Sequence, residues 1–124
     1  MLVLNGEQDA SKKALRATWK HRNTNTNLLG NHIDIVTGAW QAIGAGIGGN
    51  VDSFYEYLLK GAVMFGDNEL YQLWKTAYAA VMKYIHKSPW YIEVNMANGE
   101  ASANNFEVCS SNCYCRCCCT VVRY

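Results

Sequence analysis

Two acidic side chains, Asp52 and Glu56, have the residue types and the spacing to do chemistry together. They lie four residues apart, so a helix that begins near Asp52 would carry both on one face. The rings of Phe54, Tyr55 and Tyr57 lie beside them in the sequence. Paired carboxylates can bond sugar hydroxyls and act as general acid or base, usually near aromatic rings. The spacing therefore predicts a carbohydrate site at the start of a helix.

The same residues also have a purely structural interpretation. Ser53 and Glu56 have the spacing of a capping box, in which each side chain bonds a backbone N–H at the start of a helix. Asp52 near a helix N-terminus would be stabilising through the helix dipole alone. Spacing by itself favours this structural interpretation over the catalytic one.

A glycine-rich run at residues 44–49, Gly-Ala-Gly-Ile-Gly-Gly, precedes the acidic pair. It matches the Gly-x-Gly-x-x-Gly pattern of dinucleotide-binding turns. Asp52 counts against that function, since it would bring a carboxylate toward the bound phosphate. A βαβ unit also needs a second strand, whereas the next segment is predicted to be another helix. The glycines are therefore interpreted as a close-packed turn.

Hydrophobic periodicity predicts three helices. Apolar residues at three- and four-residue spacings indicate an amphipathic helix over residues 7–22. A second helix would run from Asp52 to Gly66, and Asp67 would cap a third that stops at Ser88-Pro89. These elements indicate a mainly helical protein in which the acidic pair opens the middle helix.

Polar residues mark the ends of the outer helices. Lys83, His86 and Lys87 fall near the end of the third helix, where cations interact favourably with the helix dipole. The polar run at residues 23–27 follows the first helix and favours a turn, because its side chains compete for backbone hydrogen bonds.

Short extended segments complete the predicted secondary structure. Residues 32–42 alternate in polarity and indicate a hairpin in which Gly38 takes a positive φ. His32 and Asp34 share one face of it. A metal or catalytic pair is one hypothesis, but two residues do not complete a site, and a hydrogen-bonded pair that holds the loop is favoured. Residues 90–96 indicate another extended segment.

Several motifs occur in an order that resembles one known family. Residues 48–60, Gly-Gly-Asn-Val-Asp-Ser-Phe-Tyr-Glu-Tyr-Leu-Leu-Lys, resemble a sequence block of glycoside hydrolase family 47, the class I α-1,2-mannosidases. The resemblance runs from about Ala14 to Asn95 and includes Trp-Lys-His-Arg at 19–22, Leu-Leu-Gly-Asn-His-Ile-Asp at 28–34, Thr-Gly-x-Trp at 37–40, Phe-Gly-Asp at 65–67 and Tyr-Ile-Glu-Val-Asn-Met at 91–96.

This resemblance implies a mainly α fold: a partial (α/α) barrel with a short β-hairpin, cut from a barrel several times longer than 124 residues. Residues 1–100 would then be a partial mannosidase domain, and the chain a fragment. Family members hydrolyse α-1,2-mannosidic bonds of high-mannose N-glycans with inversion, assisted by a bound Ca²⁺. The family's invariant acid stands at Asp52, as catalytic base or transition-state stabiliser, and Glu56 would bind or orient sugar and water.

Asp52 and Glu56 do not make a complete inverting site. Inversion needs two carboxyl groups about 6.5–9.5 Å apart, and residues one helical turn apart are too close. The resemblance implies that the general acid comes from an earlier barrel helix, and that another catalytic Glu and a Thr that helps hold Ca²⁺ come from later ones. The chain alone is therefore expected to be inactive. The alternatives are a non-catalytic glycan-binding remnant and a helical remnant whose exposed apolar faces recruit chaperones.

Asn50 bears on the branch of the family. Maturation mannosidases typically carry Arg two residues before the block's Asp, and a small residue is more similar to the ER degradation-enhancing α-mannosidase-like proteins. That branch implies the endoplasmic reticulum as compartment and N-glycans on misfolded glycoproteins as partners. The apolar run at residues 1–4 is too short for a secretory signal or a membrane span.

Charge and cysteine content limit the remaining function classes. The chain has 11 basic and 10 acidic residues and a formal net charge of +1, without the basic patch of a nucleic-acid-binding protein. All six cysteines fall within residues 109–119. Residues 115–118 contain a Cys-x-x-Cys spacing, but neither a second pair nor a His follows. Residues 101–124 are therefore predicted to be an unrelated, disordered, disulfide-prone tail, with soft-metal binding as the lesser hypothesis.

Overall fold

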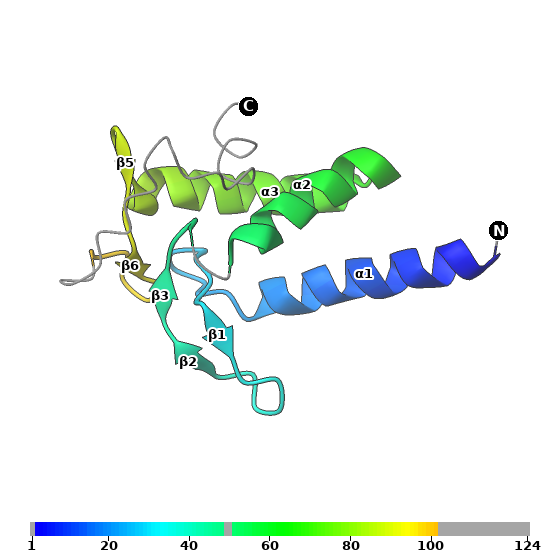
Figure 1. The fold of residues 1–124 in the computed structure, drawn as a ribbon, viewed down its shortest axis with the longest axis horizontal. Helices are drawn as coiled ribbons and strands as arrows, with labels where there is room; N and C mark the ends of the chain where they lie inside the picture. The colour runs from blue at the N-terminus through cyan, green and yellow to red at the C-terminus, as the bar shows by residue number, and fades with distance from the viewer. Residues whose placement is uncertain (1, 49–50, 102–124) are drawn as a thin grey trace.

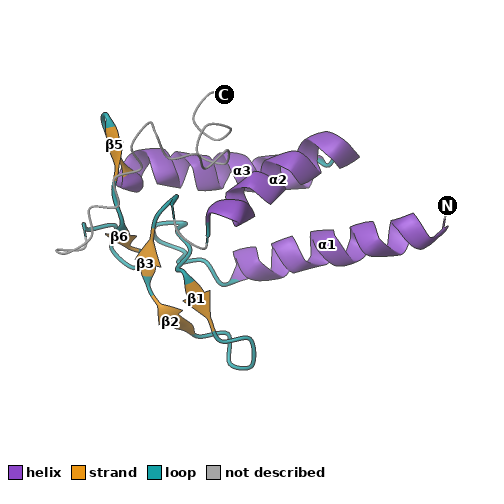
Figure 2. Cartoon of the chain, in the orientation of Figure 1, coloured by secondary structure: helices purple, strands orange, loops and turns teal. Residues whose placement is uncertain are grey.

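Three helices and six short strands make up the part of the chain that the computed structural model describes, residues 2–48 and 51–101 (Figures 1 and 2). In chain order the elements are α1 (Leu2–Lys20), β1 (His32–Ile33), β2 (Trp40–Ala42), β3 (Gly44–Ala45), α2 (Asp52–Phe65), α3 (Asn68–Ala80), the π-helical turn η1 (Val81–Ile85), β4 (His86–Lys87), β5 (Trp90–Tyr91) and β6 (Val94–Asn95). About half of the described residues are helical, which confirms the mainly α class. The predicted barrel stays a prediction.

Helix α1 begins five residues earlier than predicted and ends at Lys20. Ion pairs fix it to the start of α3: Lys12 Nζ lies 3.1 Å from Asp67 Oδ2, and the Arg16 guanidinium lies 2.6 Å from Glu69 Oε2. None of the described helices is both long enough and apolar enough to cross a membrane.

Helices α2 and α3 form an antiparallel pair, with a tight turn between them (Figure 1). Gly66 ends α2 in the left-handed conformation, with φ of 59°, which glycine adopts without a steric cost. The Asp67 side chain accepts a hydrogen bond from the backbone N–H of Leu70 and caps α3, as predicted. A Cβ at Gly61 would lie 3.0 Å from Leu70 Cδ1, so the missing side chain lets the two helices approach closely.

Asp67→Ala is expected to lower the free energy of unfolding by about 1 kcal/mol at neutral pH, the usual cost of a lost N-cap. The hydrogen bond from Leu70 N–H, and then Lys12, hold the pKa of Asp67 below its usual value. Because the folded-state pKa is lowered, the charged carboxylate stabilises the folded protein at pH values above the unfolded-state pKa of about 3.9. This stabilisation is lost as the pH falls through the folded-state pKa. Urea titrations of both proteins should therefore differ at neutral pH and converge at pH values below the lowered pKa of Asp67.

The matched control for this experiment is Asp9→Ala, which removes an exposed acid from α1. It is expected to change the free energy of unfolding at neutral pH by less than about 0.5 kcal/mol. A difference between wild type and Asp67→Ala that stays constant from neutral to acidic pH would contradict the role assigned to the Asp67 carboxylate.

The predicted hairpin at residues 32–42 is confirmed: β1 pairs antiparallel with β2, and Gly38 has a φ of 72°. Asp34 Oδ1 accepts hydrogen bonds from the backbone N–H groups of Val36 and Thr37 at 2.8 and 3.0 Å. Asp34 therefore holds the loop through the backbone of its own turn. The Trp40 indole N–H donates to the carbonyl of His21 at 2.6 Å and fixes the hairpin to the end of α1.

The end of the third helix differs from the prediction. Helix α3 ends at Ala80 and passes through η1, after which β4 and β5 pair as a second hairpin. His86 is therefore the extended residue that follows η1, and its ring centroid lies 4.9 Å from that of Tyr91. Ser88 precedes a proline, and a residue in that position disfavours the helical conformation. Pairing with β5 also gives the backbone of β4 hydrogen-bond partners that a frayed helix end would lack.

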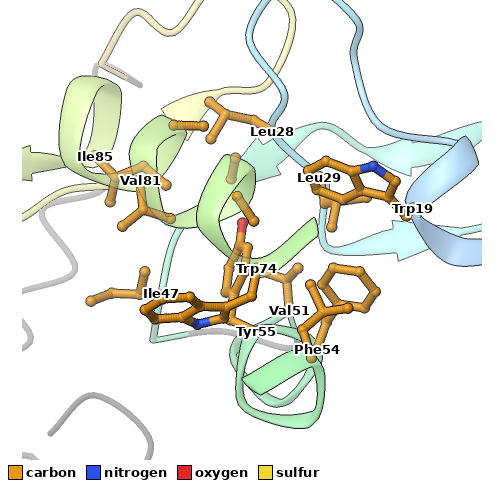
Figure 3. Packing of buried hydrophobic residues seen from close by; sticks show 14 of the residues in the cluster. Trp19, Leu28, Leu29, Ile47, Val51, Phe54, Tyr55, Trp74, Val81 and Ile85 are labelled. Atoms are coloured by element: carbon orange, nitrogen blue, oxygen red, sulfur yellow. The ribbon is translucent and has the colours of Figure 1, made fainter. Parts of the chain in front are cut away.

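The hydrophobic core lies between α2, α3 and the segments that follow α1 (Figure 3). The Trp19 ring stacks on the Phe54 ring with centroids 6.3 Å apart and joins the end of α1 to α2. The largest fully buried side chains are Tyr55, Leu28, Leu29, Leu58, Leu70, Ile85, Val81 and Val94. These residues come from five separate segments, so the core fixes the orientation of α2 relative to everything around it.

Candidate active site

Asp52 is the first residue of α2, and its side chain is half-buried. Its Oδ1 accepts a hydrogen bond from the backbone N–H of Ser53 at 2.7 Å. The predicted capping box is wrong, because the helix starts at Asp52 and the N-cap is Val51, which makes no side-chain cap hydrogen bond. Ser53 therefore lies inside the first turn, two positions after the N-cap, and cannot form the capping box with Glu56.

Glu56 lies one turn after Asp52 on the same helix, as predicted, and forms an ion pair with Lys60. The Glu56 side chain is 15% exposed, against 53% for Lys60. A sugar hydroxyl that bonds the Glu56 carboxylate would compete with the Lys60 ammonium. A Glu and a Lys four residues apart commonly form an ion pair on a helix. The Glu56–Lys60 pair could therefore have been predicted from the sequence, although the spacing of Asp52 and Glu56 alone did not indicate it.

Only one of the three aromatic rings around the acidic pair is available to a ligand. Phe54 and Tyr55 are buried in the core and orient α2, whereas Tyr57 is 60% exposed. Tyr57 lines a groove between α1 and α2 to which neither Asp52 nor Glu56 contributes. The structure therefore places the two acids at the edge of the core rather than beside a stacking platform.

The glycine run does not form a dinucleotide-binding turn. Strand β3 pairs antiparallel with β6, with Gly44 opposite Asn95 and Ala45 opposite Val94, whereas a βαβ unit needs parallel strands. The Glu93 carboxylate lies where a Cβ on Gly44 would be, so the glycine allows close packing of this side chain against the strand. The predicted close packing holds at Gly44, but this residue lies in strand β3 rather than in a turn, and a Cβ on Gly46 would meet nothing within 4 Å; residues 49–50 lie outside the described part of the chain.

The described residues contain no cluster of carboxylates that would hold calcium. Ca²⁺ takes six to eight oxygen ligands from carboxylates, carbonyl groups and water. Within residues 2–48 and 51–101, no group of three or more His, Cys, Asp or Glu side chains converges on one point. The ligands expected from the family resemblance would have to come from elsewhere.

The Tyr55 hydroxyl is buried and has no hydrogen-bond partner among the described residues. Burial raises the pKa of this hydroxyl above its usual value. A buried polar group without a partner carries an uncompensated desolvation cost, so Tyr55→Phe is expected to raise the free energy of unfolding by about 1 kcal/mol. Urea unfolding measures this change, with the exposed Tyr57→Phe as the neutral control. A loss of stability in Tyr55→Phe would show that the hydroxyl has a partner.

The comparison with protein families identifies the chain. The sequence model for glycosyl hydrolase family 47 matches residues 8–120. The chain belongs to glycosyl hydrolase family 47. This confirms the family resemblance that the motifs carried.

Three relatives define how much of a family 47 protein is present. Alpha-mannosidase I MNS4 of Arabidopsis thaliana is 48% identical over 89 residues, which are 72% of this chain and 14% of that protein. ER degradation-enhancing alpha-mannosidase-like protein 2 of Mus musculus is 40% identical over 100 residues, 81% of this chain and 17% of that protein. The corresponding protein 3 of Homo sapiens is 38% identical over 89 residues, 72% of this chain and 10% of that protein. The chain therefore spans less than one fifth of the length of each relative.

Two predictions fall on residues outside the described part of the chain. The first is the assignment to a branch of the family, which rests on Asn50. The cysteine-rich tail is another, since only residue 101 of residues 101–124 is described. The proposed boundary of the family 47 domain at residue 100 also stays a prediction.

Proposed function

We propose that this chain is part of a calcium-dependent, inverting α-1,2-mannosidase that acts on high-mannose N-glycans of misfolded glycoproteins in the endoplasmic reticulum. Membership of family 47 supports glycosidase chemistry. The names of the relatives, which include alpha-mannosidase I and ER degradation-enhancing proteins, support the substrate and the compartment. The observation that carries the proposal is the position of the Asp52 carboxylate, half-buried at the first residue of α2.

The position of Asp52 suits a catalytic carboxylate. The N-terminal end of a helix stabilises negative charge, and the buried face of α2 fixes the direction in which its first turn points. From this position Asp52 would act as base toward water or stabilise the positive charge that develops on the sugar. Glu56 would bind or orient substrate once a hydroxyl replaces its contact with Lys60.

The opposing general acid is expected from outside this chain. Inverting hydrolysis needs a second carboxyl group on the other side of the sugar, about 6.5–9.5 Å away. Glu56 follows Asp52 on the same helix, about 6 Å along its axis, and so stands beside Asp52 rather than across a substrate. Calcium, which would hold sugar hydroxyls when bound, is likewise expected to be held by residues outside those described.

The inactivity of the chain alone can be tested directly. The purified 124-residue chain is incubated with a high-mannose glycan, with calcium or with a chelator, and released mannose is measured. We expect no release above the rate without protein under either condition. Mannose release that the chelator abolishes would contradict the incomplete site proposed for this chain.

One observation favours a second function, recruitment of a chaperone by a helical remnant. A groove of about 430 Å³ runs between α1 and α2 and is lined mainly by apolar atoms. Tyr57 and Met64, which line it, are 60% and 75% exposed, and exposed apolar side chains that gather in one place mark interaction surfaces. Binding of an apolar dye that the glycan does not displace would support this function over glycan binding.

A further inference from the structure

A second groove, of about 440 Å³, separates the turn after α1 from the outer face of α3 and η1. Neither Asp52 nor Glu56 lines it, so it is distinct from the candidate active site. Its lining residues are polar, small or aromatic: Asn25, Thr26, Asn27, Gln72, Lys75, Thr76, Ala79, Ala80, Lys83 and Tyr84.

The turn that forms one wall is held in place by specific hydrogen bonds. The Asn23 side chain accepts from the backbone N–H groups of Asn25 and Thr26 at 2.9 and 3.2 Å. The buried Thr26 hydroxyl donates to the carbonyl of Met96 at 2.5 Å. Asn27 adopts the left-handed region with φ of 59°, which costs most residues energy but which asparagine tolerates. The wall is therefore preorganised before any ligand binds.

The opposite wall is a polar stripe on one helix face. Gln72, Thr76, Ala79 and Lys83 recur at helical spacing, and all four are exposed. Ala79 lines the groove between the longer side chains of Thr76 and Lys83. Because the side chain of Ala79 is short, a larger side chain at this position would fill the groove.

The groove carries positive charge that no carboxylate balances. Its lining contains Lys75 and Lys83 but neither Asp nor Glu. Their ammonium groups lie over aromatic rings, at 5.8 Å from the Tyr71 centroid and 4.7 Å from the Tyr84 centroid. Among the described residues neither lysine forms an ion pair with a carboxylate, whereas Lys12 does. The groove therefore favours an anionic ligand.

We propose that this groove binds a sugar that carries a phosphate group. The Asn25 and Gln72 amides can exchange hydrogen bonds with sugar hydroxyls. The Thr76 hydroxyl donates to the carbonyl of Gln72 and can still accept one, and Tyr84 adds an aromatic surface. Lysine ammoniums bind phosphate as point charges. Lys75 and Lys83 are eight residues apart, roughly 12 Å along a helix, so they suit a ligand longer than a phosphate ion. This site goes beyond the proposed glycosidase function and does not depend on Asp52.

The test is an NMR titration of the isotope-labelled 124-residue chain with mannose 6-phosphate, mannose and inorganic phosphate. We expect saturable shifts of backbone resonances in residues 25–27 and 72–84 with the sugar phosphate. Binding should weaken as salt is added, because exposed charges are screened. Mannose and phosphate alone should each bind at least about tenfold more weakly. Equal affinity for phosphate alone would reduce the groove to an ion site and overturn the proposal, as would the absence of saturable shifts.

Matched variants separate charge from shape. Lys75→Gln and Lys83→Gln should each weaken mannose 6-phosphate binding about two- to fivefold, and Ala79→Leu should block it. The controls are Lys13→Gln and Ala17→Leu on the exposed side of α1, which should leave affinity unchanged. All five positions are exposed, so the substitutions leave the core intact. If Ala79→Leu binds like wild type, the ligand lies elsewhere and the assignment of this groove is wrong.

Discussion

Asp52→Asn is expected to reduce mannose release at least about 100-fold in a chimera that carries residues 8–95 in place of the matching segment of alpha-mannosidase I MNS4. Asparagine keeps the shape of the side chain but cannot accept a proton as a base and carries no negative charge. Asp52 opens α2 and belongs to the part of the chain that the family model matches. The turnover number with a saturating high-mannose glycan measures the loss.

Two further variants show whether the effect is specific to Asp52. Asp9→Asn makes the same chemical change on the exposed side of α1 and should leave turnover unchanged. Glu56→Gln should raise KM more than it lowers turnover, since Glu56 is assigned to substrate binding and already contacts Lys60. Thermal melts establish that each chimera is folded. A folded Asp52→Asn chimera with turnover close to that of the parent chimera would remove Asp52 from catalysis.

Leu58→Ala is expected to lower the free energy of unfolding by about 3 kcal/mol, within the range for buried leucines. Leu58 is 0% exposed and lies on the face of α2 that enters the core. Figure 3 labels Phe54 and Tyr55, two other buried residues of the same helix. Removing its side chain takes away apolar contacts and leaves a cavity that the surrounding helices cannot fully close. Small domains have about 5–15 kcal/mol of stability in total, so much of the chain's stability would be lost.

Urea unfolding followed by circular dichroism measures this loss, and Val63→Ala provides the matched control on the same helix. Val63 is 75% exposed, so its truncation should change stability by less than about 0.5 kcal/mol. Similar effects of the two substitutions would mean that α2 does not present the Leu58 face to a core in solution.

The acidic pair shows which features of the candidate site could be predicted from the sequence. The spacing of Asp52 and Glu56 correctly placed both on the first turns of one helix. The spacing of Ser53 and Glu56 misassigned Ser53 as a cap, because the observed N-cap, Val51, lies two residues earlier in the chain. The burial of Phe54 and Tyr55 was not visible in the pattern, since an aromatic ring beside an acid suits a sugar site and a core equally well.

What the sequence by itself determined about this protein is the chemistry that acts over a few residues, together with its family. The turn at Gly66 and Asp67, the hairpin turn at Gly38 and the start of α2 all follow from local hydrogen bonds and backbone preferences. The motifs also indicated family 47 without a structure, because their residues and their order are properties of the sequence itself.

Only the tertiary structure decided which surfaces meet. The pairing of β3 with β6 and the hydrogen bond from Thr26 to Met96 join residues about 50 and 70 positions apart, and no local rule specifies them. Folding also determined that Lys12 forms an ion pair with Asp67, whereas Lys75 and Lys83 line a polar groove. The physical reason is that burial and charge balance depend on neighbours in space, which the chain brings together only when it packs.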